Sequence, residues 1–252
     1  MCYDADARPP VTTPPRTTAA AEPIALTSGD GTVFGAYSAT PAEVSGPSVL
    51  LLPDNRGLSG FYEHLAVHLA GQGHPTLAVD YFGRTAGADY RARDARFRDI
   101  GTLMPEHLAK LTRDGLYADF AAGIARLPAP VVALGFCMGG RFAFQTADKR
   151  FGLAGVIGLY GYPDALHGAS GPLQLAPDLT APILALWGGA DEGIPADLVA
   201  AFDRALTAAG TDHAFVTYPG APHGFFELAQ DAEVCADAWD RILRFLAGVR
   251  RQ

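Results

Sequence analysis

Residues 130–144 read PVVALGFCMGGRFAF. The first part, VVALGF, is a short β-branched apolar run that is typical of a buried strand in a parallel sheet. The next residues, MGGRFAFQTAD, predict the start of a helix. Cys137 stands between them, with Gly135 and Gly139 two residues to either side, so no side chain crowds a sharp turn. This G-x-C-x-G pattern has the form of a nucleophile elbow with cysteine in place of serine.

The predicted strand-turn-helix context would activate Cys137. The free N–H groups and the dipole at the start of a helix favour a thiolate. The backbone N–H of Met138 lies where an oxyanion would develop during acyl transfer. Two alternatives are a buried structural cysteine before a packing turn and a dinucleotide-binding loop. The glycines of GFCMGG do not form G-x-G-x-x-G, so we favour the nucleophile.

Length and composition exclude several classes of protein. The chain has 252 residues, 49% of them hydrophobic and 18% charged, which predicts a globular protein. A net charge of −8 disfavours a nucleic-acid partner. Cys2, Cys137 and Cys235 form no C-x-x-C pair, which suits a reducing cytoplasm and offers no metal site. Without a signal sequence or a run of about 18 apolar residues, we expect a cytoplasmic protein that does not bind a membrane.

The chain divides into a tail and one domain. Residues 1–22 are rich in Pro, Thr and Ala, which predicts an N-terminal tail or an extended wrap without regular structure. Residues 23–252 are expected to form a single domain. It opens with IALTS and TVFGAYSA, separated by Gly29-Asp30-Gly31, and this pattern predicts a hairpin of antiparallel edge strands.

From residue 48 onward, predicted strands alternate with predicted helices. This order predicts an α/β fold with a mostly parallel, eight-stranded sheet and helices on both faces. The arginine-rich segment 82–114 interrupts the alternation. It could be a solvated layer of helix and loop or a lid over the site, and the sequence leaves both open.

Two further residues follow strands near the expected site. Ligands bind at the carboxyl ends of strands in parallel α/β sheets, and there Asp191 follows ILALWGG and His223 follows AFVTY. The chain order Cys, Asp, His is that of triads in α/β hydrolases. His223 would take the thiol proton of Cys137, and Asp191 would fix the imidazole tautomer.

With these motifs in place, residues 23–248 resemble the dienelactone hydrolase family of α/β hydrolases. GFCMGG is similar to the cysteine elbow of the family, GGADEGIP to its aspartate loop and PHGF to its histidine loop. The resemblance implies the α/β-hydrolase fold and a Cys137–Asp191–His223 triad that acts without a cofactor or metal. It also implies a small ester or lactone substrate.

The resemblance extends to the surroundings of the triad. Asp54 occupies the position of an acidic residue, usually glutamate, that would hold the thiol protonated by like-charge repulsion until substrate displaces it. The N–H of Asn55 would be the second oxyanion donor beside that of Met138. Arg84 matches an arginine that binds a substrate carboxylate. A second arginine is replaced by Glu227, which favours a neutral ester or lactone.

Several other side chains carry weaker expectations. Tyr81, Phe82 and Phe225 are candidates for the wall of an apolar substrate pocket. Trp187 and Tyr160 end buried strands, where core packing is favoured over substrate stacking.

Three functions remain open from the sequence. The first is a dienelactone hydrolase-like enzyme, and the second is a general carboxylesterase or thioesterase. The third is a hydrolase fold that only binds a small molecule. The chain is expected to act as a monomer or homodimer.

Overall fold

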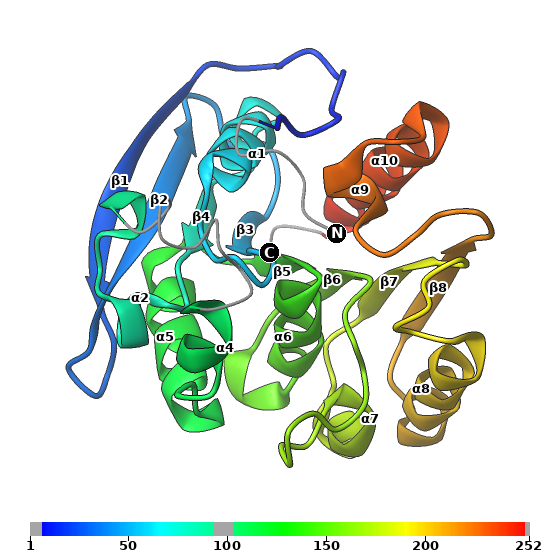
Figure 1. Cartoon of the computed structure of the whole chain (residues 1–252). Helices are drawn as coiled ribbons and strands as arrows, with labels where there is room; N and C mark the ends of the chain where they lie inside the picture. Colours follow the sequence, from blue (N-terminus) through cyan, green and yellow to red (C-terminus); the bar gives the residue numbers. More distant parts are fainter. Residues whose placement is uncertain (1–6, 93–102, 250–252) are drawn as a thin grey trace.

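One eight-stranded sheet forms the centre of the computed structural model, which describes residues 7–92 and 103–249 (Figure 1). Its strand order is β1-β2-β4-β3-β5-β6-β7-β8. The strands are β1 (Ala19–Thr27), β2 (Val33–Pro41), β3 (Ser48–Leu52), β4 (Thr76–Val79), β5 (Val131–Phe136), β6 (Gly155–Leu159), β7 (Ile183–Gly188) and β8 (His213–Tyr218).

The pairing of the strands confirms the predicted fold class. β1 and β2 form an antiparallel hairpin, and β2 pairs antiparallel with β4. The six strands β3 to β8 run parallel to one another. The prediction that nothing regular precedes Pro23 is wrong for residues 19–22, because β1 begins at Ala19. Pro23 is tolerated there because an edge strand has one side without a partner strand.

Helices cover both faces of the sheet. Figure 1 shows α1 and α10 on one face and α5, α6 and α8 on the other. The helices are α1 (Gly60–Gly71), α2 (Gly83–Ala86), α4 (Leu103–Leu108), α5 (Arg113–Arg126), α6 (Met138–Thr146), α7 (Pro172–Leu175), α8 (Ala196–Ala209), α9 (Phe225–Leu228) and α10 (Ala232–Gly248). Because two layers of helix enclose them, strands β3 to β7 are buried at every residue, which explains their continuous apolar sequences.

The N-terminal segment lies against the domain ahead of β1. The N–H groups of Arg16 and Thr17 donate to the carbonyl of Gly71 at the end of α1, at 2.7 and 3.1 Å. The indole N–H of Trp239 on α10 donates to the hydroxyl of Thr13 at 3.0 Å. The segment therefore joins two helices that lie on the same face of the sheet.

The predicted lid lies partly beyond the described residues. Segment 82–114 contains α2 and α4, but residues 93–102 lie outside the described part, so a lid remains a prediction. Cys2 at the N-terminus also lies outside the described residues. Cys235, by contrast, is buried on α10.

Candidate active site

Cys137 occupies a strained turn between β5 and α6. Its backbone has φ 53° and ψ −113°, and its N–H donates to the carbonyl of Leu159 at 3.0 Å. A Cβ on Gly135 would lie 2.0 Å from the carbonyl oxygen of Gly139, and one on Gly139 would lie 2.1 Å from that of Leu52. The glycines thus permit the close contact that the turn requires, as their spacing predicted. A left-handed backbone at a non-glycine residue is typical of a functional turn.

Asp191 and His223 come from two loops that contact each other tightly. A Cβ on Gly188, at the end of β7, would lie 2.6 Å from the carbonyl oxygen of Ala221 in the loop after β8. The N–H of Ala190 also donates to the carbonyl of Ala221, at 3.0 Å. These backbone contacts hold the aspartate loop against the histidine loop.

The three predicted residues form a continuous series of hydrogen-bonding contacts. Nε2 of His223 lies 3.0 Å from Sγ of Cys137, and Nδ1 of His223 lies 2.7 Å from Oδ2 of Asp191. The other oxygen of Asp191 accepts the N–H of Gly193 at 2.9 Å, so the carboxylate is held at both ends. Burial lowers the pKa of the His223 imidazole, but Asp191 and Cys137 outweigh it and raise the pKa to about 10. The raised pKa favours the protonated imidazole beside the sulfur atom.

A tight turn after β3 presents the backbone N–H of Asn55. In this turn the N–H of Arg56 donates to Oδ1 of Asp54 at 3.0 Å, and that of Gly57 to the carbonyl of Asp54 at 3.0 Å. Within residues 7–92 and 103–249, no acceptor is found for the N–H of Asn55 or of Met138. Both predicted oxyanion donors are therefore available to a ligand.

The carboxyl of Asp54 is paired with a neighbouring arginine. It is buried and forms an ion pair with Arg56, with 3.3 Å between Oδ2 and Nε. Burial, together with the charge of Glu227, raises the pKa of Asp54 well above its usual range. The thiol of Cys137 faces His223, and its repulsion by Asp54 stays a prediction.

Glu227, which replaces the second arginine of the family, lies inside the protein. It is buried, and its two carboxyl oxygens accept the hydroxyls of Tyr62 and Tyr160. The Tyr160 ring also packs edge-on against the imidazole of His223, with 5.3 Å between ring centres. Tyr160 therefore has a contact at the site besides its packing role. Sequence reasoning missed Tyr62 entirely, since nothing distinguishes it from other apolar-face residues of α1.

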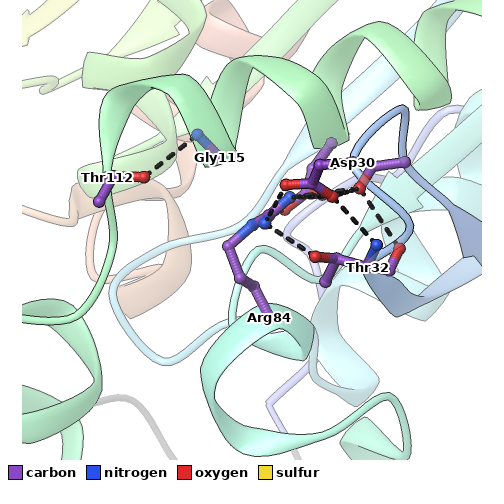
Figure 2. A network of polar contacts seen from close by, with 7 residues as sticks. Asp30, Thr32, Arg84, Thr112 and Gly115 are labelled. Carbon is purple, nitrogen blue, oxygen red and sulfur yellow. Dashed lines mark hydrogen bonds and ion pairs between the residues drawn. The ribbon is translucent and has the colours of Figure 1, made fainter.

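Arg84 is engaged away from this group of residues. Figure 2 shows its guanidinium among residues of the β1–β2 turn, next to the start of α5. It pairs with Asp119 at 2.6 Å and with Asp30 at 2.6 Å, and it donates to the hydroxyl of Thr32 at 2.9 Å. Because two carboxylates already neutralise Arg84, we correct the expectation that it binds a substrate carboxylate.

The three predicted wall residues pack inside the core. Tyr81 and Phe82 are 0% exposed and Phe225 is 2% exposed. The rings of Tyr81 and Phe82 contact each other with 4.6 Å between centres, and Phe225 packs against Tyr160. They support the site from behind instead of offering an open apolar surface. The hydroxyl of Tyr81 donates to the carbonyl of Asp54.

No group of three or more His, Cys, Asp or Glu side chains in residues 7–92 and 103–249 could hold a metal ion. No helix in the same part of the chain has the length and apolar character needed to cross a membrane.

The sheet order and the position of Cys137 between β5 and α6 are those of an α/β hydrolase. Comparison with known proteins agrees with this class. Residues 34–249 match the model of the dienelactone hydrolase family. A provisionally named carboxymethylenebutenolidase of Escherichia coli (strain K12) is 30% identical over 225 residues, which cover 83% of this chain and 80% of that protein.

Two other relatives extend over similar lengths. The carboxymethylenebutenolidase of Rhodococcus opacus is 29% identical over 214 residues, 80% of this chain and 81% of that protein. The crystal structure of a provisionally named dienelactone hydrolase from Klebsiella pneumoniae has a TM-score of 0.81 and 27% identity, covering 92% of this chain and 99% of the other. The chain belongs to the dienelactone hydrolase family, and it is by class an ester or lactone hydrolase.

Proposed function

We propose that this enzyme hydrolyses a small, uncharged carboxylic ester or lactone through a thioester at Cys137. The observation that carries the proposal is the series of contacts from Sγ of Cys137 to Nε2 of His223, and from Nδ1 of His223 to Asp191. Such a series supplies a nucleophile, a base and a group that orients the base.

In the first half of the reaction, Sγ of Cys137 attacks the carbonyl carbon and its proton resides on His223. The N–H groups of Asn55 and Met138 stabilise the negative oxygen that forms. When the C–O bond breaks, His223 gives the proton to the leaving alkoxide, which departs as the alcohol. In a lactone this alcohol stays attached to the acyl group.

In the second half, water replaces the alcohol. His223 removes a proton from the water, which attacks the thioester carbonyl. The C–S bond breaks, the carboxylic acid is released, and the proton returns to the Cys137–His223 pair. Asp191 holds the imidazole orientation through both halves, and its buried charge stabilises the imidazolium.

The charges around the site support an uncharged substrate. Asp54 and Glu227 place two carboxyl groups close to the triad, and Arg84 is already paired with Asp30 and Asp119. A substrate carboxylate would therefore find two carboxyl groups beside the triad and would lack the cation that the sequence had suggested.

Hydrolysis of p-nitrophenyl acetate and of small lactones by the full chain tests this proposal. We expect turnover by the parent enzyme and none by Cys137→Ala, which removes the sulfur atom but leaves the glycine-relieved turn unchanged. Faster reaction with acyl thioesters than with oxygen esters or lactones would instead favour a thioesterase. Equal rates for parent and Cys137→Ala would disprove the proposed nucleophile.

A further inference from the structure

Three buried side chains, Tyr62, Tyr81 and Glu227, hold the turn that carries the Asn55 N–H. From their contacts we infer that they are positioning residues for the oxyanion site, and we call them the turn clamp. This inference rests on the proposed function, since it assigns a task to the surroundings of the proposed Asn55 donor. It concerns the acylation step, in which negative charge appears on the substrate oxygen.

The first part of the turn clamp acts on the carbonyl of Asp54. The hydroxyl of Tyr81 donates to this carbonyl oxygen. Asp54 C=O and Asn55 N–H belong to one planar peptide unit, in which the two groups point in opposite directions. A bond that fixes the direction of the carbonyl therefore fixes the direction of the Asn55 N–H. It also polarises the peptide, which makes that N–H a stronger donor.

The second part acts on the N–H of Asp54, one peptide earlier. This N–H donates to the hydroxyl of Tyr62 at 3.0 Å, and the same hydroxyl donates to Oε1 of Glu227 at 3.0 Å. Tyr62 is fully buried, and its ring packs against Phe136, the residue before Cys137, with 5.7 Å between ring centres. Tyr62 therefore links the turn to the strand that ends at the nucleophile.

Glu227 closes the arrangement on the side of the histidine loop. It lies four residues after His223, on α9, and its second oxygen accepts the hydroxyl of Tyr160. Tyr160 in turn packs against the imidazole of His223. The single carboxyl group thus connects the turn that would hold the oxyanion with the loop that holds the base. Hydroxyl donors on both oxygens explain why this carboxyl can stay buried.

The turn clamp makes a prediction that a merely structural role does not. Acylation by an ester needs the oxyanion site, whereas alkylation of a thiol by iodoacetamide develops no oxyanion and needs only the Cys137–His223 pair. Loosening the turn should therefore slow acylation and leave alkylation unchanged. Because the ester is bound before charge develops, kcat should fall while KM stays nearly constant.

The variants Tyr81→Phe and Tyr62→Phe, each of which removes one hydroxyl and keeps the ring, test the clamp. Tyr218→Phe is the matched control, because the Tyr218 hydroxyl also donates to a carboxylate, that of Asp237 at 2.8 Å, but has no contact with the turn. We expect each clamp variant to lose about 10- to 100-fold in kcat for p-nitrophenyl acetate, with KM and the iodoacetamide rate within about two-fold of the control.

A double-mutant comparison tests whether Glu227 acts through Tyr62. Because the two share one hydrogen bond, Tyr62→Phe combined with Glu227→Gln should cost less than the product of the separate losses. If the losses in kcat of the two single variants multiply in the double variant, Glu227 does not act through Tyr62.

Two results would overturn the inference while the proposed function stands. In the first, the parent hydrolyses the ester, and the clamp variants have the same kcat as Tyr218→Phe. The other is an equal loss in acylation and alkylation, which would indicate general loosening of the protein. Failure of the proposed function looks different, because the parent itself would then release no p-nitrophenol.

Discussion

Oδ2 of Asp191 lies 2.7 Å from Nδ1 of His223, and the two side chains differ sharply in exposure: that of Asp191 is 2% exposed and that of His223 is 44% exposed. A fixed, buried carboxylate therefore orients an imidazole whose other edge reaches solvent and the sulfur of Cys137. This difference suits a base that must meet substrate while keeping one tautomer.

Replacing Asp191 with Asn should weaken this arrangement without changing its shape. The neutral amide no longer stabilises the imidazolium, so the pKa of His223 should fall from about 10 toward its ordinary value near 6.5. We expect kcat to fall on the order of 10³-fold or more. An NMR titration of the His223 ring in both proteins measures the pKa directly. An unchanged titration would show that Asp191 does not set it.

The three residues of the proposed triad should act as a unit. His223→Ala alone should cost on the order of 10³-fold or more in kcat, and adding Cys137→Ala should cost little further. The measurement is ester hydrolysis by the two single variants and the double variant. Losses that multiply fully would mean that Cys137 and His223 have separate roles.

The raised pKa of His223 also predicts how stability depends on pH. Because the folded state binds this proton more tightly than the unfolded state, the stabilisation is fully present below about pH 6.5. It is lost as the pH rises through about 10. Urea unfolding between these pH values should show a steeper loss of stability in the parent than in His223→Gln. Parallel curves would contradict the assigned shift.

Arg84→Ala should unfold more easily and should not change substrate preference. Asp119, whose side chain is 1% exposed, would lose its guanidinium partner inside the protein. Breaking such a pair costs about 3–5 kcal/mol of unfolding free energy, and adding Asp119→Asn should recover part of it. Calorimetry measures the stability, and assays with a neutral ester and a carboxylated lactone measure the preference. A selective rise in KM for the carboxylated lactone would restore the substrate-binding role.

The turn at Cys137 should not accept a side chain at Gly135. An alanine Cβ there would lie 2.0 Å from the carbonyl oxygen of Gly139, whereas one at Gly248 has nothing within 4 Å. We expect Gly135→Ala to lose about 3 kcal/mol or more of stability, or to fail to fold, and Gly248→Ala to remain close to the parent. Equal melting temperatures for the two variants would show that the turn has room.

The sequence predicted the fold and the proximity of Cys137, Asp191 and His223, because both follow from local patterns. Continuous apolar runs predict the buried strands, and the glycines beside Cys137 predict its turn. Asp191 and His223 follow strands in a parallel sheet, so their meeting at one edge follows from topology. None of these inferences required the direction of a long side chain.

The failed predictions about the surroundings of the site depended on such directions. Arg84 turns toward Asp30 and Asp119, which lie 54 and 35 residues away in sequence, and no local pattern reveals that choice. Glu227 turns inward to Tyr62, 165 residues away. The sequence does not reveal these partners, because the two hydroxyls that stabilise Glu227 come from α1 and from the residue after β6.

The central claim is that Cys137 becomes acylated during turnover, and mass spectrometry after rapid acid quenching tests it most directly. The parent enzyme mixed with a small excess of p-nitrophenyl acetate should carry one acetyl group, located by peptide digestion on Cys137. His223→Ala should accumulate far less of it in the same time. An acetyl group found on another residue, or ester hydrolysis at the parent rate by Cys137→Ala, would contradict the account.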